Sequence, residues 1–243
     1  QSLSRRLSNL SPAPTPTKAT AMDERSLYQL MAWLSPGYPV GAYSYSHALE
    51  AAVEAGLVHD RESLCDWLDM LVARGDGWID ACFFCHAYDA ASAEDWSGLT
   101  DVTVRAQAQR STPEIALESE AQGEAFLSAT AHAWPHAWLD RLLHPAPYAV
   151  AVAVTCAAHD LPRQASLVAY LHAFIANLAS AGRRLVPLGQ SDGQAAIADL
   201  ADTVSQTAAR APGVALDELG SATPMVDWLS ITHETQYVRL FRS

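Results

Sequence analysis

The amino-acid sequence predicts an all-α protein that folds as a single compact domain of about ten helices. Apolar residues recur along most of the chain at the three- and four-residue spacing of an amphipathic helix. Alternating strand patterns are nearly absent: Val150 to Val154 alternates with alanine, a poor strand former, and helical patterns flank it. Nothing repeats at a fixed period, so a solenoid is not expected.

The chain divides into a leader and one domain. Residues 1–21 are dominated by Ser, Pro, Thr and Ala, with prolines at every second position from Pro12 to Pro16, which predicts a disordered leader. No linker interrupts residues 22–243, which we expect to form the all-α domain. Half of the residues are hydrophobic and only 17% are charged. This domain should therefore bury much surface, part of it against other subunits.

The first half of the domain contains three helix patterns. An apolar stripe spans residues 27–34, and another spans 64–71 after Asp60, a candidate N-cap. The run Thr112–Glu114 is a typical helix start, because it offers a cap, a proline in the first turn and an acid near the positive end of the helix dipole. These signals predict a helix that includes residues 27–34 and two further helices that start after Asp60 and Thr112.

The second half of the domain continues the helical pattern. Residues 147–158 are apolar on every side, which predicts a helix buried at the centre of the protein. Apolar stripes follow at 167–178, running toward Gly182, and at 197–204. The last residues, 233–243, mix aromatic residues with arginine and follow the last helix, so we predict a flexible tail whose burial serves association more than the core.

The charge of the chain excludes several classes of partner. A formal net charge of -12, from 15 basic and 27 acidic residues, does not supply the clustered Lys and Arg that nucleic acids or anionic membranes require. No uninterrupted apolar run reaches the roughly 18 residues of a membrane span. Arg5-Arg6 also lacks the apolar run of a secretory signal. We therefore expect a cytoplasmic protein that binds neither nucleic acid nor membrane.

The segment Cys82–His86 matches the Cys-x-x-Cys-His pattern of c-type haem attachment. Haem attachment requires export, for which the sequence shows no signal. A helix would place both cysteines on one face with Ile79, so the favoured interpretation is that the thiols are small apolar fillers of the core. A haem-binding protein and a structural zinc site are the alternatives. In a cytosolic protein, disulfides among the four cysteines are not expected.

The acidic segment 114–124 favours a solvated helix face over a catalytic site. A helical hydrolase or lyase that uses Glu118 with a histidine would need a pocket that separates the pKa values of its acids. Nothing nearby in the sequence would stabilise an electrophile, and no Gly-x-Ser-x-Gly or Gly-Lys-Ser/Thr motif is present. Pro135 disturbs the turn between His132 and His136. We therefore predict no catalysis, no metal ligands and no tightly bound cofactor.

Three distant segments carry a more specific signal. The run Leu30–Glu50, LMAWLSPGYPVGAYSYSHALE, resembles the signature of urease accessory proteins of the UreF type, which is close to W-L-S-P-x-F-P-x-G-x-F-S-Y-S-H-G-L-E. The runs Arg184–Gln194, RLVPLGQSDGQ, and His233–Ser243, HETQYVRLFRS, resemble the same family. The departures are mild: Tyr38 and Tyr43 replace Phe, and Ala48 replaces Gly, with Ala being the better helix former.

The resemblance implies a urease maturation chaperone without catalysis of its own. Such a protein would be an all-α homodimer that bridges UreD or UreH and the nickel-carrying GTPase UreG, and the complex would dock on apo-urease. GTP hydrolysis would release nickel, which would travel through a passage in the accessory proteins. For the acidic segment, the resemblance adds the interpretation that Glu114, Glu118 and Gln122 line a polar passage for a divalent cation in transit.

The resemblance also marks partner-binding residues in all three segments. For Arg184 and the chain break after it, both helix capping and a subunit contact fit the sequence. The candidate partner-binding residues are Ser35, Pro36, Pro39, Gly41, Tyr43, Ser44, His47 and Glu50 in the first segment, Arg184, Pro187, Leu188, Gly189, Gln190, Gly193 and Gln194 in the second, and His233, Glu234, Tyr237, Arg239, Leu240, Phe241 and Arg242 in the third.

Overall fold

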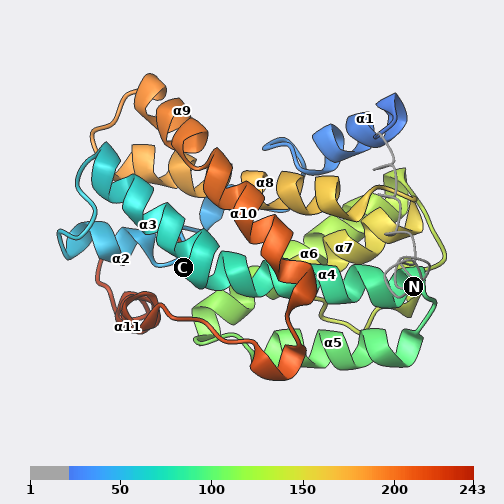
Figure 1. The fold of residues 1–243 in the computed structure, drawn as a ribbon. Helices are drawn as coiled ribbons and strands as arrows, with labels where there is room; N and C mark the ends of the chain where they lie inside the picture. Colours follow the sequence, from blue (N-terminus) through green and yellow to red (C-terminus); the bar gives the residue numbers. More distant parts are fainter. Residues whose placement is uncertain (1–21) are drawn as a thin grey trace, which may run out of the picture.

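The computed structural model describes residues 22–243, and the leader predicted at residues 1–21 lies outside them. Within the described residues the chain forms eleven α-helices and four short 3-10 turns, and no β-strand. The all-α prediction is therefore confirmed. The helices assemble into one body, with α4, α6, α7 and α8 at its centre (Figure 1).

Local sequence signals set several helix boundaries. Asp60 accepts the backbone N–H of Ser63 at 2.9 Å and caps α3, and Thr112 accepts that of Ile115 at 3.3 Å and caps α6. Both predicted N-caps are thus confirmed. In chain order the helices are α1 (Glu24–Trp33), α2 (Leu49–Glu54), α3 (Arg61–Arg74), α4 (Asp76–Ser92), α5 (Trp96–Ala108), α6 (Pro113–Ala133), α7 (Tyr148–Ala158), α8 (Arg163–Leu185), α9 (Gln190–Asp199), α10 (Ala201–Arg210) and α11 (Pro224–His233).

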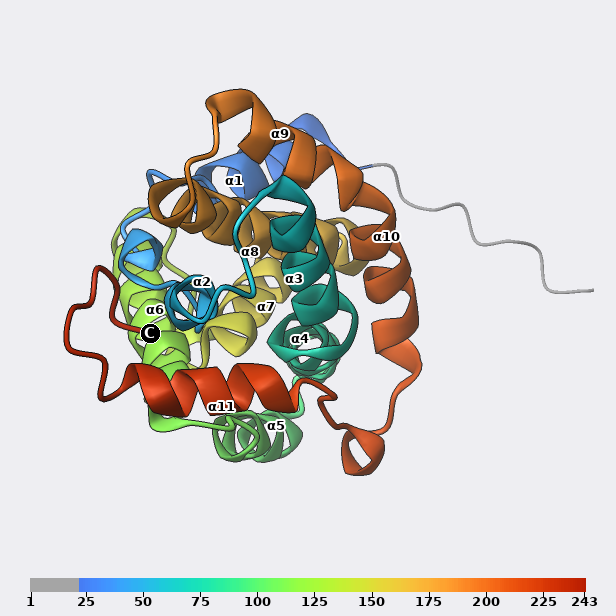
Figure 2. The same cartoon turned by 90° about the vertical axis from the view of Figure 1, so that its left-hand side faces the viewer.

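Helix α7 is the centre of the hydrophobic core. Every residue from Ala149 to Ala157 is buried, and α4, α6 and α8 pack around the helix (Figure 2). This confirms the buried helix predicted over residues 147–158. On α4, Cys82 and Cys85 are buried in the same core, and His86 donates from Nε2 to the carbonyl oxygen of Val214 at 2.8 Å. The two thiols fill the core, as the sequence predicted.

The apolar stripe predicted on α1 is only partly buried. Leu30 faces the core, but Leu27 and Met31 are exposed. Trp33 determines which face turns inward, because its fully buried indole packs edge-on against Phe126 of α6, with ring centroids 6.5 Å apart. The apolar stripe predicted over residues 27–34 thus packs on the core at Leu30 and Leu34 but not at Leu27 and Met31. The outer side of α1 keeps an exposed apolar strip.

Helix α8 is, within residues 22–243, the one helix long and apolar enough to cross a membrane by length and composition. Half of its most apolar stretch is buried inside the protein, with Leu167, Leu171 and Leu178 in the core. The helix packs against α4 and α7. These contacts are those of a core helix.

Candidate partner-binding site

The three segments singled out in the sequence meet at one place in the fold. Arg184, in the last turn of α8, donates to the carbonyl oxygen of Tyr43 at 2.7 Å. Its guanidinium also lies 4.2 Å from the centroid of the Phe241 ring. Arg242 donates its backbone N–H to the carbonyl oxygen of Ser44 at 2.8 Å. Residues about 140 and 200 positions apart in the chain thus form one contiguous surface.

The first segment changes direction through left-handed backbone. Just after the end of α1, Ser35 donates its hydroxyl to the carbonyl oxygen of Ala32 at 3.1 Å, and Gly41 then adopts a φ of 73°. His47 and Ala48 also have positive φ, 55° and 62°. Ala48 therefore precedes α2 in a conformation that favours glycine, and its helix propensity does not apply. The expectation that replacing Gly by Ala is harmless here was wrong.

His47 is buried between two carboxylates. Its Nε2 lies 3.1 Å from Asp76 Oδ2, and its Nδ1 lies 3.3 Å from Glu118 Oε2. Burial disfavours the charged imidazole, but the attraction of Glu118 and the hydrogen bonds to Asp76 and Glu118 outweigh it and raise the pKa of His47 to about 10. At neutral pH the side chain is an imidazolium that joins the first segment to α4 and α6.

A second charged group extends this arrangement into the core. Arg110 lies between α5 and α6 with a nearly buried side chain, and it donates to Asp80 Oδ1 at 2.5 Å. It also lies 3.6 Å from Asp76, while Tyr170 donates to Asp80 Oδ2 at 2.6 Å. We call His47, Asp76, Asp80, Arg110, Glu118 and Tyr170 the polar cluster.

Sequence reasoning missed most of the polar cluster. Asp76 and Asp80 lie one turn apart on α4, a helix that is otherwise largely apolar and buried. Two acids at that spacing on an apolar helix are a signal that a buried cation faces them, because unpaired buried carboxylates are strongly unfavourable. Nothing in the local sequence identifies Arg110 as that cation.

His233 repeats the arrangement of His47 at the end of α11. It is fully buried, with Nδ1 2.7 Å from Glu114 Oε2 and Nε2 3.2 Å from Glu50 Oε2. Arg239 adds a bond of 2.5 Å to the other oxygen of Glu114. These contacts tie α11 and the start of the tail to α2 and α6.

The end of the tail is packed against the protein rather than free. Glu50 accepts the backbone N–H groups of Leu240 at 2.7 Å and Phe241 at 2.9 Å, and Phe241 is only 4% exposed. Ser243 is buried and donates to Glu118 Oε2 at 2.6 Å. The tail has no regular helix, but its last residues are held by carboxylates that the apolar pattern did not reveal. The expectation of a flexible tail, whose burial serves association more than the core, was therefore wrong for these last residues.

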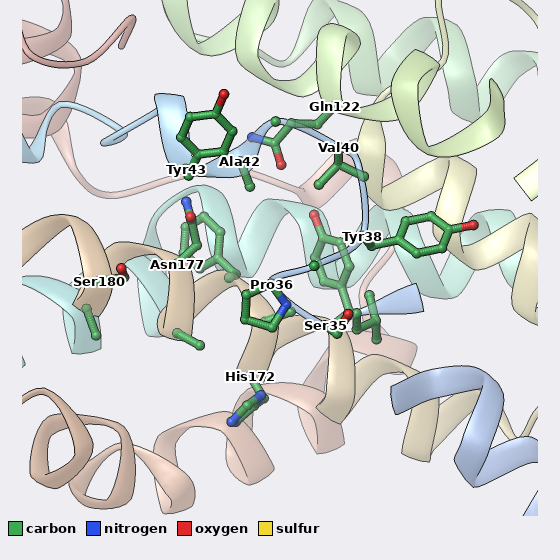
Figure 3. A pocket seen from close by; sticks show the side chains of 18 of the residues that line it. Ser35, Pro36, Tyr38, Val40, Ala42, Tyr43, Gln122, His172, Asn177 and Ser180 are labelled. Atoms are coloured by element: carbon green, nitrogen blue, oxygen red, sulfur yellow. The ribbon is translucent and has the colours of Figure 1, made fainter. Parts of the chain in front are cut away.

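A cavity of about 520 Å³ opens beside the first segment. The loop before α2, α8 and the start of α9 surround it, and Figure 3 shows side chains of the loop and of α8 around the space. Its lining includes Ser35, Pro36, Pro39, Gly41, Tyr43, His172, Asn177, Arg183, Gly193 and Gln194. Glu118 and Gln122 line this cavity and also a cavity of about 30 Å³ that reaches His47, Asp80 and Arg110. The two spaces thus adjoin at Glu118.

The acidic segment on α6 does not form a solvated face at Glu114 and Glu118, although the side chain of Glu124 is partly exposed. Glu118 and Gln122 are buried, with Gln122 Nε2 donating to Glu118 at 3.2 Å, and Glu114 is mostly covered by α11 and the tail. The favoured interpretation from the sequence was therefore wrong, because α6 packs against both α7 and α11. In residues 22–243 no three His, Cys, Asp or Glu side chains are grouped as metal ligands.

The predicted partner-binding residues separate into three groups by burial. His47, Glu50, Gly193, His233 and Phe241 are buried, so they hold the segments together and offer no surface. Ser35, Gly41, Ser44 and Leu188 are partly covered. The residues with exposed side chains or backbone are Pro36, Pro39, Tyr43, Arg184, Pro187, Gly189, Gln190, Gln194, Glu234, Tyr237, Arg239, Leu240 and Arg242.

Comparison with known proteins points to one family. The family model described as UreF matches residues 58–201, a range that includes α6 and the segment 184–194 but neither the first segment nor the tail. A protein of Magnetococcus marinus named urease accessory protein UreF is 46% identical over 228 residues, 90% of this chain and 99% of the relative. Proteins of the same name from Granulibacter bethesdensis and Rhodopseudomonas palustris strain BisB5 are 46% and 47% identical, over 94% and 95% of this chain and 98% of each relative.

Proposed function

The chain belongs to the UreF family of urease accessory proteins, and we propose that it bridges UreD or UreH and the GTPase UreG during GTP-dependent delivery of nickel to apo-urease. Members of this family act in urease maturation and are not enzymes. The bridging role is supported by one observation above all: the three family-like segments converge where Arg184 contacts both Tyr43 and the buried Phe241, and Arg184 and Tyr43 stay exposed there.

The exposed part of the tail suits a protein partner. Tyr237 is fully exposed and Leu240 is 61% exposed, although both are large side chains of the kind that anchor interfaces. Helix α11, which precedes the tail, also exposes Trp228 and Ile231, by 63% and 50%. We assign this surface, α11 with the tail, to UreD or UreH, since large exposed apolar side chains gathered on neighbouring segments are characteristic of interaction sites.

The two adjoining cavities support a route for a cation. Glu118 and Gln122 line both spaces, so a divalent ion entering the larger cavity would meet a carboxylate and an amide oxygen. Oxygen groups of this kind interact with divalent cations without the tight tetrahedral cage of a resident metal site. Nickel is cargo in this proposal, in transit through the protein, and no tightly bound cofactor is required.

A homodimer is the second part of the proposal. The exposed apolar strip of α1, with Leu27, Tyr28 and Met31 45%, 67% and 66% exposed, lies far from the tail surface along the chain and has no cover within residues 22–243. A second copy of the chain would bury it. We place the assembly in the cytoplasm, where the urease subunits and UreG would also be found.

Capture of UreD or UreH by tail variants tests the bridging role. We expect Tyr237→Ala with Leu240→Ala to weaken capture at least tenfold and to lower the nickel content of co-expressed urease, because both exposed anchors are lost. Tyr28→Ala on α1 is the matched control, since it removes an exposed aromatic side chain from the other surface, and capture should persist. Unchanged capture by the double variant would refute the assignment of this surface.

A further inference from the structure

We propose that the chain contains a peptide-binding cleft, formed by residues 44–50, the start of α6 and Arg184, and that residues 239–243 are its exchangeable ligand. The ligand class is a short peptide with an aromatic anchor between basic residues, here Arg-Leu-Phe-Arg-Ser. The cleft goes beyond the proposed function, because it concerns how the protein binds its own tail. It does not depend on whether the tail contacts UreD or UreH.

The cleft binds the tail mainly through main-chain groups, as peptide receptors do. Both carboxylate oxygens of Glu50 accept backbone N–H groups, from Leu240 at 2.7 Å and from Phe241 at 2.9 Å. The N–H of Arg242 reaches the carbonyl oxygen of Ser44 at 2.8 Å. Three consecutive backbone donors are thus satisfied by the cleft, two of them through charge-assisted hydrogen bonds.

One side chain of the segment acts as an anchor. Phe241 is 4% exposed, whereas Leu240 beside it is 61% exposed. The Arg184 guanidinium covers the Phe241 ring at 4.2 Å from the ring centroid, a cation–π contact that also shields the aromatic group from water. A buried aromatic flanked by exposed residues is the usual form of a peptide anchor.

Polar contacts bind Ser243 at the end of the segment. The N–H of Ser46 donates to the carbonyl oxygen of Ser243 at 3.1 Å, and the Ser46 hydroxyl donates to the same oxygen. The Ser243 hydroxyl donates to Glu118 Oε2 at 2.6 Å and accepts the N–H of His47 at 3.3 Å. The charges of the segment and the cleft are also complementary, since Arg239 of the segment pairs with Glu114 at the rim of the cleft.

The segment can leave as a unit because the preceding residues are not packed. Glu234, Thr235 and Val238 are exposed, and Tyr237 has no contact that buries it. Such a connection acts as a short tether, which keeps the segment at an effective concentration on the order of millimolar. A cleft of modest intrinsic affinity therefore stays filled in the intact chain, while a competing peptide or partner can empty it.

Emptying the cleft would change the interior of the protein. Glu50 would lose its backbone donors, and Glu118, which lines both cavities, would lose the hydroxyl of Ser243. The position of the tail would then control whether the Glu118 carboxylate is free to face the two adjoining cavities. This consequence, unlike the cleft itself, rests on the proposed function.

A truncated chain with a synthetic peptide tests the cleft directly. The chain ending at Thr235 is titrated with the peptide Gln236–Ser243, and saturable binding with a rise in melting temperature is expected. Phe241→Ala in the peptide should weaken binding at least tenfold, and Glu50→Gln in the protein should do the same. The matched control is Tyr237→Ala in the peptide, which should bind as the parent does. No binding at millimolar peptide, or equal binding of the Phe241→Ala and parent peptides, would overturn the proposal.

A second experiment covers the case in which the truncated chain does not fold. A protease site placed between Gln236 and Tyr237 of the full chain is cut after folding. The cleaved segment should then co-elute with the protein and be displaced by excess free peptide of the same sequence, but not by the Phe241→Ala peptide. A segment that dissociates at once, or that no excess of peptide displaces, would contradict an exchangeable ligand.

Discussion

The core around α7 and the polar cluster around His47 are both buried, but they are stabilised in opposite ways. Residues 149–157 bury only apolar side chains apart from one threonine. Each apolar side chain stabilises the fold independently, through the transfer of its own surface out of water. The polar cluster buries three carboxylates and two cations from α4, α6 and two loops. In the polar cluster every buried charge depends on its partner. Removing one group should therefore lower the free energy of unfolding by much more than the buried area of that group suggests.

The sharpest way to test this contrast is to remove the central cation. Arg110→Ala leaves Asp80 without its cation in the interior and Asp76 with His47 alone, and we expect the free energy of unfolding to fall by about 3–5 kcal/mol. Urea denaturation measures this loss. Arg105→Ala on α5 is the matched control, because Arg105 also pairs with two acids but at an exposed site, where such pairs contribute little. Equal effects of the two substitutions would remove the distinction.

A dependence on pH separates the two regions further. Because the pKa of His47 is raised to about 10 in the folded protein, its contribution is complete below its ordinary pKa of about 6.5 and is lost as the pH rises toward 10. We expect stability to fall by a few kcal/mol, on the order of the linkage energy, between these limits. His47→Gln should flatten that decline, as measured by urea denaturation at pH 6.5, 8 and 9.5.

The contact between His47 and Asp76 also makes the stability of the protein depend on pH on the acid side. Burial alone would raise the pKa of Asp76, but its hydrogen bond to His47 lowers it below the ordinary value. Its contribution is therefore present above about pH 4 and is lost on acidification. A core substitution such as Leu68→Ala should shift the whole stability curve without altering either slope, since it removes no titrating group. A pH-independent stability of the parent protein would contradict this account.

The difference between the regions also explains what could be predicted from the sequence. The core follows from periodicity within single helices: residues 147–158 and the caps Asp60 and Thr112 were all assigned correctly. The polar cluster depends on pairs such as Asp80 with Arg110 and Glu118 with His47, which are 30 and 71 positions apart. No local pattern encodes such pairs, so the acidic face of α6 was misassigned to solvent. The family resemblance located all three segments but not their mutual contact.

Truncation of the thiols on α4 should have a smaller effect than any change in the polar cluster. Replacing Cys82 and Cys85 together by Ala removes two buried sulfur atoms from the apolar core, and we expect a loss of about 1 kcal/mol per site. Urease activation should persist. Thermal denaturation and a urease assay check both statements. Loss of activation in a fully folded variant would show that the thiols have a role outside the core.

The smallest expected effect has the opposite sign. Ala48 has a φ of 62° before α2, a conformation that costs a residue with a side chain about 1–2 kcal/mol relative to glycine. Ala48→Gly should therefore increase stability by up to about 1 kcal/mol, because the more flexible unfolded chain offsets part of the relief. Ala52→Gly, within α2, should destabilise. A decrease in melting temperature for Ala48→Gly would show that the local backbone is not strained.

The central claim is that buried carboxylates position the tail so that the three segments form one partner-binding surface, and Glu50→Gln tests it most directly. Glu50 is 7% exposed and accepts the tail's backbone N–H groups. A partner can therefore make little direct contact with Glu50, and weaker binding by the variant would reflect the position of the tail. The measurement is the dissociation constant of UreD or UreH for this variant, with far-UV circular dichroism as the check of folding. We predict at least tenfold weaker binding by a folded variant. Unchanged binding by a folded Glu50→Gln protein would contradict the account.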